Sequence, residues 1–236
     1  MRKFWQKEWF DIKFASFCKP NPRKVADEQF YSSFYREFFN KYKSYEDLPI
    51  CWRKEKEEIA SFIHKLVKNK KKVLAIGCGI GYVENTLHNK KIDGELVAIE
   101  PSVNATKWLN DNNKLRIVKG YFPTCLVNYE KFDFAYMSYI DYVFNDESYI
   151  EFLKDIRKYP IKETLVIGAC VNNPGLVQLA KYLVKKYMIG IGLLNWQLWG
   201  WQRTIEEHVD IFKKAGYLNI ENGQLENGSY WFLAKK

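Results

Sequence analysis

Three glycines, Gly77, Gly79 and Gly81, stand at alternate positions in the segment VLAIGCGIGYVE, which covers residues 73–84. An apolar run precedes them and a helical pattern follows them. A strand, a glycine turn and the start of a helix together direct backbone N–H groups and the positive helix end toward one point, where a ligand can approach the backbone closely. The segment therefore predicts a ligand-binding loop. A tight turn without a ligand is the alternative.

The spacing of the glycines distinguishes between classes of ligand loop. A phosphate-binding P-loop needs a Lys-Ser or Lys-Thr pair after its last glycine, and none follows Gly81. A dinucleotide loop needs its third glycine at position 82, where this chain has Tyr82. The G-x-G-x-G spacing therefore excludes a P-loop and argues against an NAD-linked oxidoreductase.

A second feature of the sequence fits the same ligand. Glu100 ends the apolar run ELVAIEP, 23 residues after Gly77. A carboxylate at that place can accept hydrogen bonds from both hydroxyls of a ribose. The glycine spacing together with Glu100 resembles the class I S-adenosylmethionine-dependent methyltransferases of small-molecule type. Phe132-Asp133 and the segment FKKAGY also resemble this family, and the resemblance covers residues 57–236.

The resemblance implies a Rossmann-like α/β fold, S-adenosyl-L-methionine as the methyl donor and S-adenosyl-L-homocysteine as the product. It implies donor contacts from Gly77, Cys78, Gly79, Gly81, Glu100, Pro101, Tyr121 and Ser138. The chain departs from the family after the third strand, where an Asp or Asn usually contacts adenine and this chain has Gly120 and Tyr121. We therefore expect backbone groups, with packing on Pro101 or Tyr121, to hold the adenine.

The methyl acceptor should meet residues outside the carboxyl ends of the strands, since ligands of open α/β sheets bind there. Asp141, in the segment MSYIDYVF, and His208 are the candidate catalytic bases. A helix cap or a surface role is the alternative for each. The candidate substrate contacts are Tyr35, Tyr139, Trp199 and Arg203, the last as a clamp for a phosphate or a carboxylate.

The sequence lacks the motifs that are typical of several acceptor and cofactor classes. No NPPY-like sequence follows the fourth strand, and no cysteine has a catalytic pattern, which disfavours methylation of nucleobases. The five cysteines include no C-x-x-C pair, so we expect neither a metal site nor a disulfide framework. No run of about 18 uninterrupted apolar residues is present, and the first residues do not resemble a signal peptide, so we expect a cytoplasmic protein without a membrane span.

The net charge of +9 leaves an RNA methyltransferase as the alternative function. Only seven of the 37 basic residues are arginine, however, and the chain is rich in Lys, Asn, Ile, Tyr and Phe together, which suggests a codon bias. We therefore expect methyl transfer to an oxygen or a nitrogen of a small polar metabolite, such as one that bears a sugar, a phosphate or a carboxylate, and no nucleic-acid partner. A homodimer remains open. A non-catalytic protein that keeps the fold is a third alternative.

Short apolar runs alternate with helical patterns from residue 57 onward, which predicts a mostly parallel sheet covered by helices on both faces. These runs are 73–77, 95–100, 115–118, 132–138 and 163–170, and the segments 217–222 and 229–234 should add an antiparallel hairpin around Asn227-Gly228. The fold class is therefore α/β, a Rossmann-like seven-stranded sheet with an N-terminal helical lid.

The first part of the chain differs in composition from the rest. Residues 1–56 hold 15 of the 40 aromatic residues, and Phe30, Phe34 and Phe38 recur at helical spacing. A first helix is expected over residues 5–17 and a second around residue 34. We predict residues 1–56 as an aromatic lid segment, 57–236 as the methyltransferase domain, and 171–203 as a lid insertion on the other side. Two lids would enclose a small acceptor.

Overall fold

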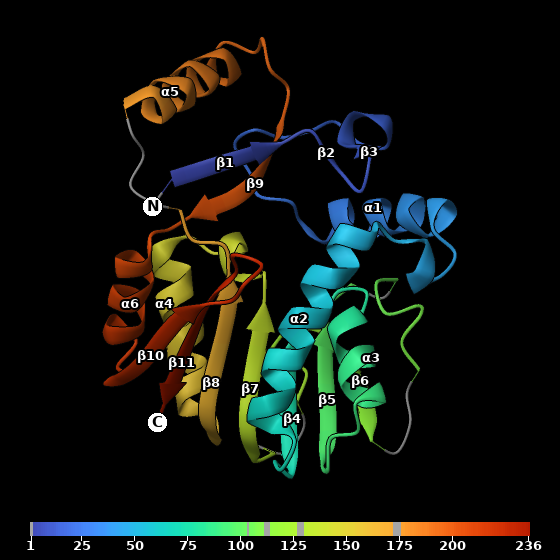
Figure 1. The fold of residues 1–236 in the computed structure, drawn as a ribbon. Helices are drawn as coiled ribbons and strands as arrows, with labels where there is room; N and C mark the ends of the chain where they lie inside the picture. The colour runs from blue at the N-terminus through green and yellow to red at the C-terminus, as the bar shows by residue number, and fades with distance from the viewer. Residues whose placement is uncertain (1, 103, 111–113, 127–129, 172–175) are drawn as a thin grey trace.

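A seven-stranded sheet carries the fold in the computed structural model, which describes residues 2–102, 104–110, 114–126, 130–171 and 176–236. The strand order is β10-β11-β8-β7-β4-β5-β6 (Figure 1). The parallel strands are β4 (Lys72–Ile76), β5 (Glu95–Glu100), β6 (Leu115–Lys119), β7 (Phe132–Ser138) and β8 (Ile161–Gly168). β11 (Tyr230–Lys235) is antiparallel to both β8 and β10 (Asn219–Gln224). The predicted sheet and its terminal hairpin are confirmed.

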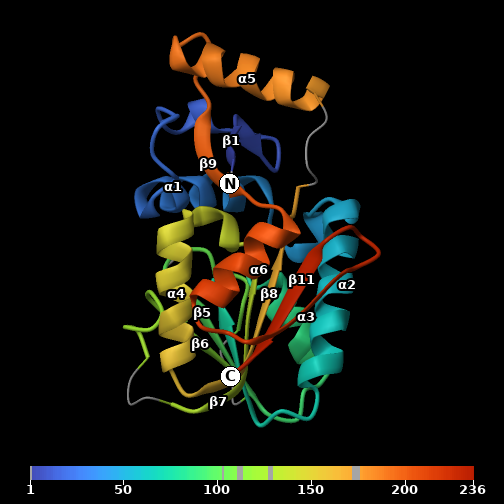
Figure 2. The same cartoon turned by 90° about the vertical axis from the view of Figure 1, so that its left-hand side faces the viewer.

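Helices cover both faces of this sheet, as the alternating pattern predicted (Figure 2). α2 (Ile50–Val67) and α3 (Tyr82–Asn89) pack on one face, and α4 (Asp146–Lys158) and α6 (Ile205–Lys214) on the other. α2 buries Ile59, Ile63 and Val67, which recur at helical spacing. α6 begins at the capping box that Thr204 forms with Glu207.

A covering layer lies over the carboxyl ends of the strands. It consists of β1 (Arg2–Gln6), the short hairpin of β2 (Glu8–Trp9) and β3 (Ile12–Lys13), α1 (Glu28–Lys41), α5 (Leu176–Gly190) and β9 (Gln197–Gln202) (Figure 1). β1 and β9 pair in antiparallel register from Arg2 with Gln202 to Gln6 with Gln197. Segments far apart in the sequence therefore build one layer.

The helix predicted over residues 5–17 is wrong. Trp5 and Trp9 lie in strands, Phe14 begins a single 3-10 turn, and Phe10 and Asp11 form the two-residue turn between β2 and β3 with positive φ at both positions. The spacing of large aromatics fits a helix as well as a strand, and the deciding partner of β1 lies about 195 residues further along the chain. The helix expected around residue 34 is present as α1.

The boundary proposed between lid and domain falls within α2. That helix begins at Ile50 in the covering layer and continues to Val67 on the face of the sheet (Figure 1). α1 begins at Glu28, and the side chain of Asp27 caps it by accepting a hydrogen bond from the Phe30 backbone N–H. The covering layer is thus joined to the sheet domain by a continuous helix.

Candidate active site

A cavity of about 700 Å³ lies above the carboxyl ends of β4, β5 and β7. The glycine loop forms its floor, and α1 and β9 form its roof. The predicted site residues that line it are Gly77, Cys78, Gly79, Glu100, Pro101, Tyr121, Ser138, Asp141, Tyr35, Tyr139 and Trp199. Gly81, Arg203 and His208 are not among its lining residues. The fold thus brings together eleven of the fourteen predicted positions.

The three glycines of the loop have different roles. All adopt left-handed backbone, with φ of +71° at Gly77, +57° at Gly79 and +73° at Gly81. A Cβ would lie 2.9 Å from Ile140 at Gly77 and 2.7 Å from Leu109 at Gly81, so these two glycines allow close packing. At Gly79 the nearest atom is the Tyr35 hydroxyl, at 3.4 Å. Gly79 is therefore the glycine whose missing side chain leaves space in the cavity.

The Glu100 carboxylate is fixed beside this loop. Its Oε2 accepts a hydrogen bond from the Gly79 N–H at 2.8 Å, and its Oε1 accepts one from the Ser102 N–H at 2.9 Å. Burial raises the pKa of Glu100, and the two backbone hydrogen bonds oppose that shift. Each oxygen keeps a further lone pair, so the group can still accept hydrogen bonds from a ligand in the cavity.

Tyr121 and Pro101 line the end of the cavity beyond Glu100. The Tyr121 side chain is 57% exposed, and its hydroxyl lies 3.5 Å from Oε2 of Glu28 at the start of α1. Gly120 has a φ of +128° and donates its N–H to the Glu100 carbonyl. An aromatic ring and a proline ring thus stand where a flat base could pack.

Glu84 on α3 lines the cavity and was missed by the sequence analysis. Its side chain is 2% exposed, and its Oε1 accepts a hydrogen bond from the Tyr136 hydroxyl at 2.8 Å. Its Oε2 has no hydrogen-bond partner among the described residues. Burial raises the pKa of Glu84 to about 7, and the Glu100 charge adds to the shift, whereas the Tyr136 hydrogen bond opposes it. A buried carboxylate oxygen without a partner suits a cationic ligand group.

Lys56 on α2 is the second residue that the sequence analysis missed. Its Nζ lies 3.8 Å from the centre of the Tyr139 ring and 2.9 Å from Oε1 of Glu55. Burial lowers the pKa of Lys56. Lys56 interrupts an apolar stripe of α2 between Trp52 and Ile59, and Glu84 stands at helical spacing between Ile80 of the glycine loop and Leu87 of α3. That interruption of a stripe was the signal available in the sequence.

The roof of the cavity is aromatic. Trp199, from β9, is 3% exposed and stacks on Phe14 with 5.2 Å between ring centroids. Tyr31 and Tyr35, one helical turn apart on α1, stack at 6.4 Å. Burial raises the pKa values of both tyrosines well above the usual range, so both phenols are neutral at physiological pH. These side chains could pack on an acceptor and exclude water.

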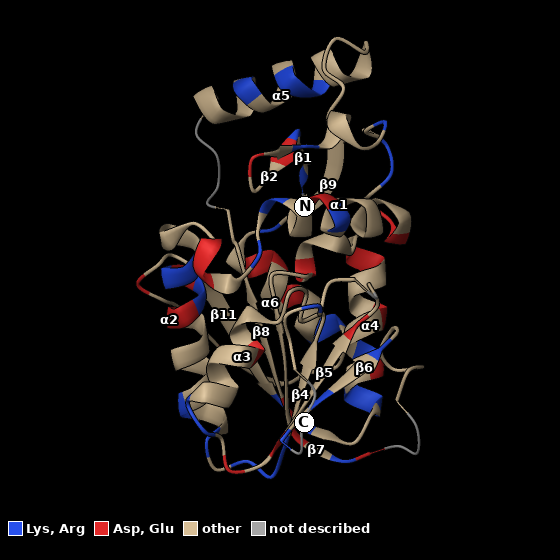
Figure 3. Cartoon of the chain, turned by 90° about the vertical axis from the view of Figure 1, so that its right-hand side faces the viewer, with Lys and Arg blue, Asp and Glu red and all other residues tan. Residues whose placement is uncertain are grey.

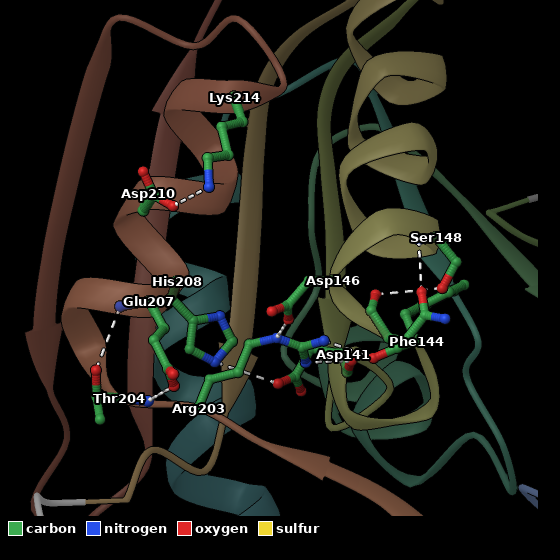
Figure 4. A network of polar contacts seen from close by, with 11 residues as sticks. Asp141, Phe144, Asp146, Ser148, Arg203, Thr204, Glu207, His208, Asp210 and Lys214 are labelled. Atoms are coloured by element: carbon green, nitrogen blue, oxygen red, sulfur yellow. Dashed lines mark hydrogen bonds and ion pairs between the residues drawn. The ribbon is translucent and has the colours of Figure 1, made fainter. Parts of the chain in front are cut away.

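Asp141 lies at the cavity, but its carboxylate belongs to a buried polar cluster (Figure 4). Its Oδ2 is 3.5 Å from Nε2 of His208, and a Cβ at Gly168 would lie 2.6 Å from its Oδ1. Burial raises the pKa of Asp141 to about 6, although the Arg203 charge opposes the shift. The carboxylate is thus buried in the cavity wall, close to β8 and α6.

Arg203 does not offer its guanidinium to the cavity, contrary to the proposed anion clamp. It is 1% exposed, and its Nε bonds Oδ1 of Asp146 at 2.8 Å (Figure 4). Its Nη atoms donate to the carbonyls of Asp141 and Phe144. The side chain turns toward the start of α4 and stabilises that turn.

His208 is likewise in the core. It is fully buried on the sheet side of α6, where its ring stacks on Phe232 at 4.7 Å between centroids. Burial lowers the pKa of His208 to about 3, and the Arg203 charge adds to this shift. The imidazole is therefore neutral at physiological pH and lies behind Asp141.

Comparison with known proteins assigns the chain to a family. A family model described as "Methyltransferase domain" matches residues 51–220. No curated protein matches the chain in sequence. These matched residues contain the glycine loop, Glu100, Asp141 and β9.

Solved structures resemble the fold at low sequence identity. Human N-acetylserotonin methyltransferase in complex with S-adenosylmethionine has a TM-score of 0.59 and 14% identity, and the match covers 89% of this chain and 56% of that one. Mitomycin 7-O-methyltransferase has a TM-score of 0.62 and 15% identity, with 89% and 58% covered. Magnesium protoporphyrin IX methyltransferase from Synechocystis, with bound S-adenosylhomocysteine, has a TM-score of 0.54 and 14% identity, with 79% and 84% covered. The chain thus spans less than two thirds of the first two proteins, and the likeness is one of fold.

Proposed function

The chain belongs to the methyltransferase-domain family, whose methyl donor is S-adenosyl-L-methionine, and on that premise we propose that it methylates an oxygen or a nitrogen of a small molecule. The roof of the cavity carries this proposal. α1 and β9 cover the glycine loop and leave about 700 Å³, a volume that suits a donor and a small acceptor rather than a polymer.

The lining residues fit the donor along the whole cavity. Gly79 and Glu100 would receive the ribose, with Pro101 and Tyr121 beside the adenine. In the sheet, β4 lies between β5, which ends at Glu100, and β7. Glu84 and Lys56 line the cavity on the β7 side. The unpartnered Oε2 of Glu84 would accept a hydrogen bond from the ammonium group of the methyl donor. Lys56 would pair with the carboxylate of the methyl donor.

Methyl transfer depends more on how the chain positions the two reactants than on acid–base chemistry. When bound, S-adenosyl-L-methionine would supply an electrophilic methyl group on a positively charged sulfur. The glycine loop and Glu100 would hold the methyl donor. Tyr35, Tyr139 and Trp199 would hold the acceptor and keep water out, with Ser138 beside them at the end of β7.

The charge of the cavity wall narrows the choice of acceptor. Lys56 is the only basic residue among its described lining residues, while six carboxylates line it: Asp27, Glu28, Glu55, Glu84, Glu100 and Asp141. With Arg203 bonded to Asp146, a phosphate- or carboxylate-bearing acceptor receives little support. We propose a neutral or amine-bearing aromatic molecule, whose ring packs on Trp199 and the tyrosines of α1.

For a hydroxyl acceptor, Asp141 remains the proposed base, since burial brings its pKa to about 6. Asp141→Asn should then lower kcat about 10²-fold and leave the affinity for S-adenosylhomocysteine unchanged. Single-turnover kinetics and calorimetry would measure the two effects. An undiminished kcat would remove Asp141 from the catalytic residues. His208→Gln serves as the comparison, because the imidazole contacts Asp141 but does not line the cavity.

The affinity for S-adenosylhomocysteine should rise with pH. A bound ammonium group favours ionised Glu84, whose pKa is raised to about 7 without ligand, so binding near neutral pH releases protons. Between about pH 6 and pH 8 the affinity should increase about tenfold and then level off. Calorimetry in buffers of different ionisation enthalpy measures both the affinity and the protons released.

The variant Glu84→Gln isolates this effect from the other groups that titrate or carry charge nearby. Glu84 faces Tyr136 on β7, Cys78 in the glycine loop, Tyr45 before α2, and Glu100 on β5. Glutamine keeps the shape and a hydrogen bond to Tyr136 but cannot ionise. Its affinity should be lower and independent of pH over the same range. An unchanged pH dependence would place the ammonium elsewhere.

The function itself is tested with donor that carries a labelled methyl group. The purified protein should label members of a panel of phenols, anilines and aromatic amines, and it should leave total RNA unlabelled. RNA labelling at physiological salt would instead favour the alternative, an RNA methyltransferase.

All five cysteines are free thiols, which supports our proposal that the enzyme works in the reducing cytoplasm.

A further inference from the structure

α5 carries an apolar face that the fold leaves exposed. Eight of the eleven exposed large hydrophobic side chains among the described residues lie between residues 176 and 193. They are Leu176, Val177, Leu179, Leu183, Val184, Tyr187, Ile191 and Leu193, with exposed fractions from 39% to 86%. Such a concentration of exposed apolar side chains marks an interaction surface.

The opposite side of α5 packs on the rest of the covering layer. Ile189 is buried there, and Lys185 donates a hydrogen bond to the Trp5 carbonyl at 3.0 Å while its Nζ lies 4.1 Å from the Trp196 ring centre. Tyr182 packs on Trp5. At 3.6 residues per turn this side lies opposite Leu183 and Tyr187, so the apolar face points away from the fold. Figures 1 and 2 both show α5 as the outermost element.

Two exposed lysines flank the apolar face. On the helix, Lys181 lies at one edge of the face and Lys186 at the other, and both are exposed. Neither Asp nor Glu occurs between residues 164 and 205 (Figure 3). An apolar face with a lysine at each edge is the arrangement of helices that lie in the interface of a membrane, where the lysine ammonium groups reach the headgroups.

The excess positive charge of the chain gathers at this end of the molecule. Residues 1–24 hold seven basic and two acidic residues, and residues 164–202 hold three basic and none acidic, so these two segments carry eight of the nine net positive charges of the chain. The two segments lie together because β1 pairs with β9. The rest of the chain is close to neutral, so the field of these two segments would orient α5 toward a negatively charged surface.

We propose that α5 binds the surface of an anionic lipid membrane, with its apolar face at the boundary of headgroups and acyl chains. The charge favours this partner over a second copy of the chain, since two such helices face to face would bring lysines together with no acidic residue between them. Nucleic acid would use the lysines but not the eight apolar side chains. Within the described residues no helix has the length and apolar content to cross a bilayer, so α5 would lie on the membrane.

Sedimentation with lipid vesicles tests the proposal on the full chain. Vesicles of phosphatidylcholine with about 30% phosphatidylglycerol should bind the protein at least tenfold more tightly than vesicles of phosphatidylcholine alone, and about 0.5 M NaCl should weaken that binding. The double variant Leu183→Glu/Tyr187→Glu should lose at least tenfold in vesicle affinity, and so should Lys181→Glu/Lys186→Glu.

Matched controls carry the same changes elsewhere. Leu218→Glu alters an exposed leucine outside α5, and Lys65→Glu/Lys68→Glu alters two exposed lysines of α2 and its end. These controls should keep the vesicle affinity, and all variants should bind S-adenosylhomocysteine as the unaltered chain does. The proposal is overturned if anionic vesicles do not bind, or if the controls lose as much affinity as the α5 variants. It is also overturned if the apolar variant only converts a dimer to a monomer, or if the lysine variant only releases RNA.

Discussion

Replacing Gly79 with arginine should abolish donor binding while the chain stays folded. The side chain would leave the backbone toward the cavity, where the nearest atom to a Cβ is the Tyr35 hydroxyl at 3.4 Å. The affinity for S-adenosylhomocysteine should fall at least about 10³-fold, since the ligand and the arginine cannot share the space. The φ of +57° adds strain of about 1–2 kcal/mol, which lowers Tm by a few degrees.

The control for this substitution is Gly228→Arg. Gly228 has a φ of +85° in the turn between β10 and β11, and the nearest atom to a Cβ there is 3.9 Å away. It therefore carries similar backbone strain outside the cavity, and calorimetry should find its donor affinity unchanged. A Gly79→Arg protein that binds S-adenosylhomocysteine within tenfold of the original affinity would contradict the proposed site.

Glu100→Ala should weaken donor binding about 10²–10⁴-fold. The carboxylate would accept both ribose hydroxyls, and hydrogen bonds to a charged group contribute about 1.5–3 kcal/mol each. Since Glu100 also accepts the N–H groups of Gly79 and Ser102, the loop loses its anchor in the same variant. Titration calorimetry with S-adenosylhomocysteine measures the loss, and a thermal melt measures the folded state.

A ligand analogue separates the ribose contact from damage to the loop. An S-adenosylhomocysteine analogue without ribose hydroxyls should bind the unaltered protein weakly, and Glu100→Ala should weaken it far less than it weakens the natural product. If the substitution reduced both affinities by the same factor, Glu100 would act only by holding Gly79 and Ser102, and the ribose would have another acceptor.

Local sequence signals were sufficient for the sheet and the donor end of the site. Gly77, Gly79 and Glu100 lie within 24 consecutive residues of a strand–loop–helix–strand unit, so their relative positions follow from local geometry. The apolar runs predicted strands within a few residues of their ends, because a buried parallel strand needs continuous apolar side chains. The turn at Asn227-Gly228 likewise depends on its own two residues.

The covering layer and the other half of the site depend on contacts between distant segments. β1 has no signal that separates it from a helix until β9 supplies its hydrogen-bond partners. Lys56 and Glu84 come to the same cavity from different helices, and the face that each helix turns inward is set by packing on the sheet.

Arg203 and His208 also show what the sequence left undetermined. Both were predicted as site residues, yet both side chains are buried in the core, and Arg203 is hydrogen-bonded to Asp146 there. The sequence by itself therefore determined the class of fold, the family and the donor loop, because these depend on residues close together in the chain. Only the tertiary structure decided which charged side chains face the cavity, because a side chain's direction depends on how whole elements pack against one another.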